Sequence, residues 1–406
     1  VNAVLIPVDS IMGTTPSSDT HPLENVKDGK PATYFKGKNA SFSWIGYDLG
    51  EPYVITQVGY ASPKNYSGKM LLGIFEGANN PDFSDAIPFY MIKSTPTEER
   101  LILKKVNCSR GFRYVRYVGP SGSNAAISEM KFYGDKGEGD DSQLFQITNL
   151  PLVNIHTQKG GEITSKTEYL PGVMSLISGD GSEFFTDSLN VRGRGNGSWT
   201  FDQKPYKIKL NKKARLLDMP AKAKKWTLIN CVRDKSMIRN IIAYEASRMF
   251  GMAYTPAARM VEVTLNGEYK GIYQLTDQIE VNKNRVKVTE MEPTDKAEPE
   301  ITGGYLLEVD AAGGEACMFR SGRFGTPITI HYPKDDEITT DQKEWIRKYY
   351  NKYEQVTFST RFKDPVKGIP SMLDVESYLR RFLLGEFTAN TDDWYSVYFY
   401  KERNDS

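Results

Sequence analysis

The sequence predicts a chain of more than one domain, with an all-β sandwich at the N-terminus and an α+β domain after it. Short apolar runs separated by Gly, Pro, Asn and Asp fill residues 1–134, and no long helical pattern interrupts them. A polar, glycine-rich stretch follows, and beyond it strand patterns mix with at least three helical ones. With 406 residues, 39% of them hydrophobic and 25% charged, the chain can bury two or three cores.

The charge balance and the cysteines exclude several classes of protein. The 52 basic and 51 acidic residues give a formal net charge of +1, so no overall field draws the chain to nucleic acid or to an anionic membrane. No run approaches the ~18 apolar residues of a membrane span. No secretory leader is visible, although a chain that begins at Val1 fits one whose leader has been removed. The cysteines match no zinc spacing and allow one disulfide at most, so we expect reduced thiols at Cys108, Cys231 and Cys317.

Residues 1–134 are predicted to form the sandwich. The segment 112–118 alternates in the manner of a strand, and shorter apolar runs lie at 53–55, 70–75 and 101–103. The stretch from Gly134 to Ser142 offers no apolar face to either neighbour. We therefore expect a linker at 135–143 and a second domain at 144–406.

Several motifs of the first domain resemble the discoidin, or factor 5/8 type C, family. They are Asp28–Tyr34, Trp44–Gly50, Phe112–Tyr117 and Ile127–Tyr133. The resemblance implies a jelly-roll β-sandwich that binds sugars or other surface ligands through loops at one end, and several such domains hold a structural Ca²⁺. Candidate side chains for stacking on a sugar are Tyr34, Phe35 and Trp44. For Trp44 the pattern favours a core position, because aromatic side chains bury much apolar surface.

The second domain contains a glycine-rich turn, Arg192–Trp199, that leads into an alternating strand, Lys204–Leu210. Glycines let backbone N–H groups approach an anion closely, while Lys and Arg neutralise it, so the segment suggests a clamp for phosphate. Alternation places Tyr206, Ile208 and Leu210 in the core and Lys207 and Lys209 on the opposite face, where an ordinary solvated hairpin would also put them. The turn does not satisfy the Walker spacing and lies in no βαβ unit, so neither a P-loop enzyme nor a dinucleotide-binding fold is indicated.

A helix is predicted at 235–250, with Asp234 as its N-cap and Gly251 as its stop. Its apolar stripe includes Glu245. A buried carboxylate needs a cationic partner, and a strand lysine that follows a glycine-rich turn is the partner found in the small lobe of protein kinases. Alternatively, Glu245 lies at the solvated edge of the stripe or pairs only structurally.

The elements predicted at the end of the chain follow an order that is also found in protein kinases. After a predicted hairpin with Asn266-Gly267 at its turn, a last helix covers about residues 374–389. It ends at Asn390-Thr-Asp-Asp393, and a strand follows at 395–400. Helix, acidic loop and strand is the order that places a kinase's catalytic aspartate, although Asp and Asn are also common turn residues.

Together these segments resemble the CotH family, named after a spore-coat protein, whose members have an atypical protein-kinase-like fold. The matching stretches follow in order over residues 150–401: 192–199, 204–210, 234–240, 254–256, 265–273, 303–308 and 386–392. The resemblance implies an ATP- and Mg²⁺-dependent phosphotransferase that acts on protein hydroxyls.

The resemblance also implies roles for individual residues. The turn, with Arg192, Arg194, Asn196 and Ser198, would lie over the nucleotide phosphates. Lys209 or Lys204 would contact the phosphates, with Lys207 on the same strand and Glu245 as the partner of the lysine. At the acidic loop, Asp392 would orient and deprotonate the acceptor hydroxyl with support from Asn390, and Asp393 is the adjacent alternative.

The sequence departs from the family in one respect, and two classes of function therefore stay open. Family members continue to a Trp-Asp-x-Asp motif that supplies the metal ligand, whereas this sequence stops at Ser406. We therefore expect the second domain to be incomplete and the main metal ligand to lie beyond Ser406. The first class is a protein kinase, secreted or at the cell surface, that its sandwich tethers to a glycan or a partner. The second is a non-catalytic adhesion protein that uses a kinase-like scaffold.

Overall fold

The computed structural model describes residues 3–140, 147–310, 317–391 and 393–405. The chain forms two compact units. The first comprises Val1–Leu217 with Ala223–Val232 and Arg259–Leu275, and the second comprises the remaining segments, Asp218–Lys222, Arg233–Ala258 and Thr276–Ser406.

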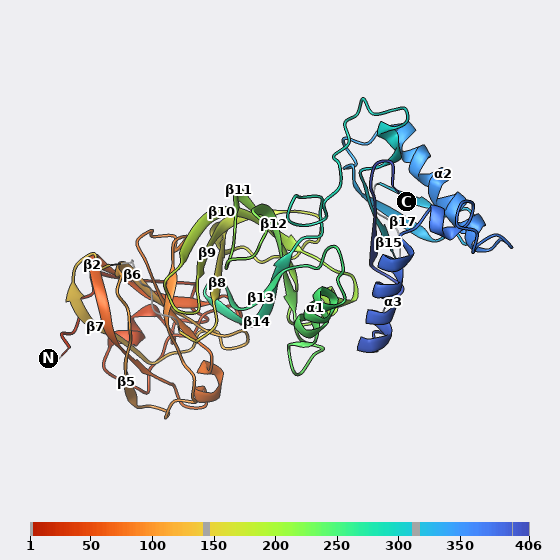
Figure 1. Cartoon of the computed structure of the whole chain (residues 1–406). Coiled ribbons are helices and arrows are strands. Elements are labelled where there is room, and N and C mark those ends of the chain that lie inside the picture. Colours follow the sequence, from red (N-terminus) through yellow and green to blue (C-terminus); the bar gives the residue numbers. More distant parts are fainter. Residues whose placement is uncertain (1–2, 141–146, 311–316, 392, 406) are drawn as a thin grey trace. The chain divides into compact units, whose positions relative to one another are not determined.

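The N-terminal part of the first unit is the predicted β-sandwich (Figure 1). The long strand β2 pairs with four others, and all of these pairs are antiparallel. Large aromatic side chains such as Tyr47, Phe75 and Tyr117 are fully buried between the strands. The strands are β1 (Ser10–Gly13), β2 (Trp44–Ala61), β3 (Ile74–Ala78), β4 (Ile87–Met91), β5 (Leu101–Lys105), β6 (Gly111–Val118) and β7 (Glu129–Lys136).

The sandwich extends beyond its expected end at residue 134. Strand β7 pairs with β2 as far as Lys136, the Gly111 N–H donates to the Glu138 carbonyl, and the Asp140 N–H donates to the Ser109 carbonyl. Gly139 allows this return because its φ of 68° is one that glycine adopts without strain. Residues 135–140 of the expected linker thus pair with the sandwich, and residues 141–143 lie outside the described part of the chain.

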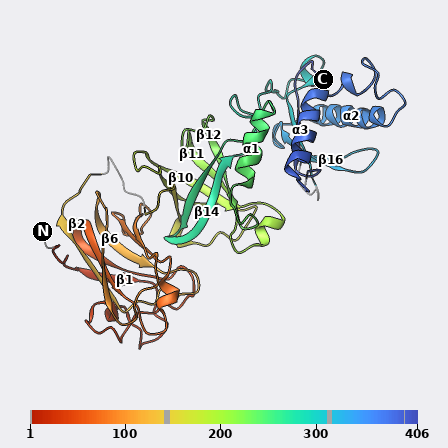
Figure 2. The ribbon, with the colours of Figure 1, turned by 60° about the horizontal axis from the view of Figure 1, so that its bottom comes forward.

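The rest of the first unit is a closed barrel in the order β10-β11-β12-β14-β13-β8-β9 (Figure 2). Strands β8 and β13 pair in parallel and close it. The predicted Asn266-Gly267 hairpin is confirmed, and both residues have positive φ. The strands are β8 (Leu152–Thr157), β9 (Leu170–Ile177), β10 (Phe184–Gly193), β11 (Tyr206–Ala214), β12 (Ala223–Asn230), β13 (Ala258–Leu265) and β14 (Glu268–Asp277).

A buried ion pair lies where the sandwich meets the barrel. Arg116 Nε donates to Glu76 Oε1 at 2.6 Å, and the Glu76 side chain is 0% exposed. His156 of β8 lies 3.8 Å from the other Glu76 oxygen, and a Cβ on Gly267 would lie 2.8 Å from Glu76 Oε1. The barrel therefore covers the sandwich's charged pair without room for a side chain at Gly267.

The second unit contains a four-stranded sheet in the order β16-β17-β15-β18. Helix α2 packs Ile346 and Trp345 against one face of it, with the Trp345 and Tyr305 rings stacked 5.9 Å apart. Helix α2 was not predicted from the sequence, although Thr339 and Gln342 form a capping box at its start. The elements are α1 (Arg239–Met249), β15 (Tyr305–Val309), β16 (Met318–Arg320), β17 (Pro327–Tyr332), α2 (Thr340–Thr357), α3 (Val375–Thr388) and β18 (Val397–Lys401).

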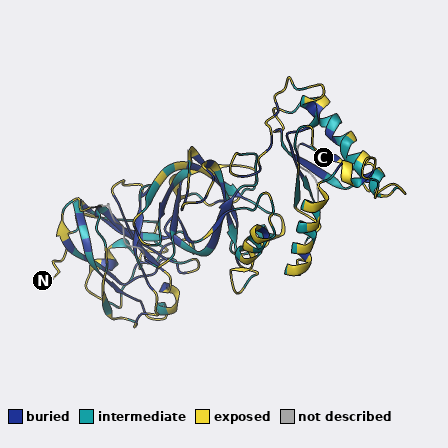
Figure 3. Cartoon of the chain, in the orientation of Figure 1, coloured by how far each residue is buried: buried dark blue, intermediate teal, exposed yellow. Residues whose placement is uncertain are grey.

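Helix α1 starts later and is more exposed than expected. Asp234 accepts hydrogen bonds from the Ser236 and Arg239 N–H groups, but Met237 has a φ of 62°, so regular helix begins only at Arg239. Ile242 is 56% exposed and Met249 87% exposed, so the expected buried stripe is wrong. Helix α3 is likewise exposed along Leu379 and Leu383 (Figure 3). Among the described helices, none is long and apolar enough to cross a membrane.

Because His156 is buried at the junction of the sandwich and the barrel, we expect the stability of the protein to fall in acid. Burial lowers the pKa of His156 despite the opposing effect of Glu76, and Arg116 lowers it further while Asp85 raises it. The folded state therefore binds the proton less readily than the unfolded state. The contribution of neutral His156 to the free energy of unfolding is fully present above the pKa of the unfolded state, about 6.5. It is lost as the pH falls below that value.

We expect His156→Gln to reduce this loss by about 1 kcal/mol between pH 7.5 and pH 5.5. The measurement is urea unfolding of the intact chain at both pH values, with and without the substitution. Comparing the two differences removes any constant effect of the substitution, and equal pH dependence in both proteins would contradict the assignment.

Candidate functional site

The glycine turn of the first unit connects β10 to β11, and we call residues 193–205 the glycine loop. Its three glycines have different surroundings. A Cβ on Gly193 would overlap the Trp199 ring, and Gly195 has a φ of 78° with the Ser198 hydroxyl against it. A Cβ on Gly197 would meet nothing within 4 Å. Packing and backbone conformation thus explain Gly193 and Gly195, whereas Gly197 faces open space.

Hydrogen bonds to β12, to Cys231 just after it and to β14 hold the glycine loop in place. Gln203 Nε2 donates to the Lys270 and Ile272 carbonyls of β14, and Gln203 Oε1 accepts from the Cys231 N–H. Asn230 of β12 donates to the Gln203 carbonyl at 2.6 Å, and the Tyr273 hydroxyl donates to the Lys204 carbonyl at 2.9 Å. These anchoring hydrogen bonds were not predicted from the sequence. The loop is consequently fixed at its C-terminal end before any ligand binds.

The cationic residues beside the glycine loop lie on the outside of the barrel. Tyr206, Ile208 and Leu210 are buried, as predicted, and Lys209 is exposed. Arg192 of β10 is the register partner of Lys207 on β11. The Arg192 guanidinium lies 5.1 Å from the Tyr169 ring, and its Nε is buried with no hydrogen-bond partner among the described residues.

Other residues predicted to contact phosphate form hydrogen bonds within the glycine loop instead. Lys204 Nζ donates to the Trp199 carbonyl at 2.8 Å, so this lysine stabilises the loop. Lys166 Nζ donates to the Gly195 carbonyl and lies 3.5 Å from Asn196 Oδ1. Arg194 takes part in the loop through its backbone, whose N–H donates to the Pro205 carbonyl. Of the two lysines proposed to contact phosphate, Lys209 is the one left exposed.

Glu245 does not have the buried environment that was expected. Its side chain is 63% exposed and pairs with Arg248 one turn along α1 at 2.5 Å. The structure therefore supports the alternative of a purely structural pair. Helical spacing showed which residues share a face with Glu245, but not whether another element covers that face.

In the acidic loop after α3, Asp393 is fixed by contacts with the helix. Asp393 lies 3.1 Å from the Arg381 guanidinium, and its carboxylate packs directly over Gly385 of α3. Asn390 Nδ2 lies 3.4 Å from Asp393 Oδ1. Asp392, the predicted base, lies outside the described residues. Asp393 is thus committed to an ion pair with Arg381.

Within the described residues, no group of three or more His, Cys, Asp or Glu side chains is placed to hold a metal ion. Ca²⁺ and Mg²⁺ also bind through backbone carbonyls, water and phosphate oxygens, so the expected Ca²⁺ of the sandwich and Mg²⁺ stay predictions. All three cysteines are free, in agreement with the expectation of reduced thiols.

Only one of the three sugar-binding candidates lies at an accessible aromatic surface of the sandwich. Phe35 is 0% exposed and bridges Ile127, so its assignment to a sugar site is wrong. Trp44 is half-buried between the Phe83 ring and the Arg116 guanidinium, which supports the alternative of a packing role. Tyr34 is partly exposed, stacks on His21 with ring centroids 4.2 Å apart, and lies 5.5 Å from the Tyr66 ring.

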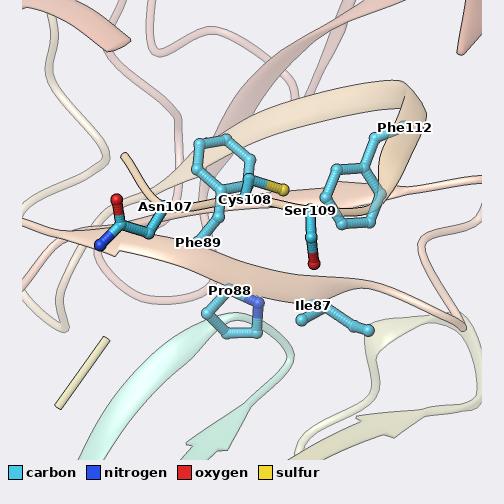
Figure 4. Close-up of a pocket in the computed structure, with 7 residues that line it drawn as sticks. All are labelled: Ile87, Pro88, Phe89, Asn107, Cys108, Ser109 and Phe112. Carbon is cyan, nitrogen blue, oxygen red and sulfur yellow. The ribbon is translucent and has the colours of Figure 1, made fainter. Parts of the chain in front are cut away.

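A small pocket in the sandwich is unsuited to a sugar or nucleotide. Phe89, Cys108 and Phe112 contribute to its walls (Figure 4). Its cavity volume is about 10 Å³, roughly what one water molecule requires. Burial raises the pKa of the Cys108 thiol to about 11, and its Sγ donates to the Arg110 carbonyl, so it is no reactive nucleophile.

Comparison with solved structures finds similar domains for the N-terminal part of the chain. One is the CBM62 from Clostridium thermocellum Xyl5A, with 38% identity, a TM-score of 0.32, and coverage of 32% of this chain and 97% of that one. Another is the CBM32 of AlyQ, with 22% identity, a TM-score of 0.27, and coverage of 32% and 97%. A third, CBM32-1 from a family 31 glycoside hydrolase of Clostridium perfringens, has 15% identity, a TM-score of 0.27, and coverage of 32% and 96%.

Comparison with protein families gives a match to the C-terminal part of the chain. No curated protein is significantly similar in sequence. The family model described as CotH kinase protein matches residues 191–406. The match begins at Val191 near the end of β10 and includes both the glycine loop and the acidic loop. This match spans 216 of the 406 residues, and the chain therefore belongs to the CotH family.

Proposed function

We propose that the CotH domain transfers phosphate from ATP to hydroxyl groups of proteins. The observation that carries the proposal is Gly197, which faces open space in a loop that is otherwise anchored on the barrel. A glycine without a packing or conformational reason is suited to close approach of a ligand to the backbone. The cationic neighbours Arg192 and Lys209 suit an anionic ligand such as a polyphosphate.

In this proposal the chain's own residues position and neutralise the reacting groups. ATP supplies the phosphoryl group. Backbone N–H groups near Gly197 and the side chains of Arg192 and Lys209 would offset its charge. Asp392 would accept the proton of the acceptor hydroxyl, with Asn390 nearby, as the acceptor oxygen bonds to the γ-phosphorus of ATP. The bond from that phosphorus to the bridging oxygen breaks, and ADP leaves. No step of this proposal is assigned to a metal ion.

The test of transfer uses labelled ATP, a protein acceptor and the full chain. Asp392→Asn and Lys209→Ala should each lower the rate by about tenfold or more, because each removes charge used in the transition state. Lys224→Ala is the matched control, since Lys224 is an exposed strand lysine on the neighbouring β12. Transfer that is unchanged in both site variants would exclude these assignments.

The glycines of the loop give a second, independent test. Gly197→Ala should leave the free energy of unfolding within about 0.5 kcal/mol of the wild-type value but weaken ATP binding, because the new methyl group occupies the open space. Gly195→Ala should destabilise the protein by about 1–3 kcal/mol, because alanine is strained at a φ of 78°.

Chemical unfolding and nucleotide titration of each variant separate the two effects. Normal ATP affinity in Gly197→Ala would show that no ligand approaches there. A loss of stability equal to that of Gly195→Ala would show that Gly197 is structural.

We also propose that the sandwich binds glycans and that the protein acts outside the cytoplasm or at the cell surface. The supporting observation is the accessible pair of rings, Tyr34 and Tyr66, on loops of the sandwich. Aromatic rings with polar edges suit sugars, which present both C–H and hydroxyl groups.

A glycan array with the full chain tests this binding, and Tyr34→Ala with Tyr66→Ala should remove it. Phe324→Ala, an exposed aromatic residue of the second unit, is the control. Glycan binding without any phosphate transfer would favour the adhesion function over the kinase. An array with no signal would contradict the proposed glycan binding.

A further inference from the structure

The accessible rings of the sandwich lie beside two lysines. We call His21, Tyr34, Lys36, Tyr66 and Lys69 the tyrosine–lysine patch. Lys36 Nζ lies 5.7 Å and Lys69 Nζ 5.1 Å from the centroid of the Tyr66 ring. The rings and ammonium groups come from three segments that are distant in sequence, so the fold gathers them at one place.

No carboxylate in the described chain forms an ion pair with either lysine. The acidic side chain bound to this loop is Glu98, and its Oε1 accepts from the Asn65 N–H at 2.8 Å and the Ser67 hydroxyl at 3.1 Å. Glu98 therefore shapes the loop that presents Tyr66. Lys36 and Lys69 keep their positive charge beside an aromatic surface.

One further feature of the patch points to a ligand. His21 Nδ1 is buried and has no hydrogen-bond partner among the described residues, although the His21 ring is held by stacking on Tyr34. Such atoms usually find a partner in native proteins.

We propose that the tyrosine–lysine patch binds a polysaccharide whose sugar rings carry carboxylates. The inference rests on the proposed glycan binding of the sandwich and specifies its ligand. A sugar ring lies against Tyr66 and Tyr34, and the two ammonium groups turn from the Tyr66 ring to the carboxylates. An exposed cation–π contact is weaker than a charge-assisted hydrogen bond, so this exchange is favourable. His21 Nδ1 gains a sugar hydroxyl as its partner.

The test compares two forms of one polymer, polygalacturonate and its methyl ester, whose backbones are the same but whose carboxylates are free or blocked. We expect the full chain to bind the free acid roughly tenfold more tightly, as two partly exposed charge pairs would give. Lys36→Gln with Lys69→Gln should remove this preference. Lys104→Gln with Lys105→Gln, which removes the same charge from exposed positions on β5, should retain it.

The outcomes separate this inference from the proposal beneath it. Equal binding of both polymers that depends on Tyr34 and Tyr66 would overturn the acidic specificity and leave glycan binding intact. Binding lost equally in both lysine pairs would mean general charge attraction and would also overturn it. Failure to bind either polymer or any neutral glycan of the array would contradict both. Circular dichroism of each variant confirms that the fold is retained.

Discussion

The parallel pairing of β8 and β13 is the constraint on which the first unit depends, because it closes the barrel and leaves no strand edge open. A buried polar chain supports it. The Thr264 hydroxyl donates to Asn154 Oδ1 at 2.6 Å, and Asn154 Nδ2 donates to the Ser175 hydroxyl at 3.1 Å. These groups satisfy one another only in this register, so closure fixes the positions of β10, β11 and the loop between them.

Closure also explains how a loop with three glycines keeps one shape. The glycine loop leaves β10 and returns through β11, but its hydrogen bonds reach β12 and β14 through Asn230 and Gln203. Such cross-strand anchors exist only once the barrel is complete. The ordering cost of the backbone is therefore met during folding, and a ligand at Gly197 meets a surface that is already formed.

Sequence patterns predicted local features well and long-range partners poorly. The alternation of Tyr206, Ile208 and Leu210 and the hairpin at Asn266-Gly267 follow from neighbouring residues alone, and both are confirmed. Gln203 bonds to a carbonyl 67 residues away, which no local pattern encodes. Glu245 failed for a related reason, because periodicity gives a shared face but not what covers it. Asp392 stays a prediction.

The placement of the two candidate surfaces within one unit has a consequence for function. The tyrosine–lysine patch and the glycine loop both belong to the first unit, whereas the acidic loop belongs to the second. The buried Glu76–Arg116 pair and His156 join the sandwich to the barrel inside that unit. A glycan held by the sandwich would therefore hold the glycine loop to the same surface, and tethering of this kind raises the effective concentration of acceptors carried there. Substrate choice would then depend on which proteins share the polysaccharide surface, in addition to the sequence around the acceptor hydroxyl.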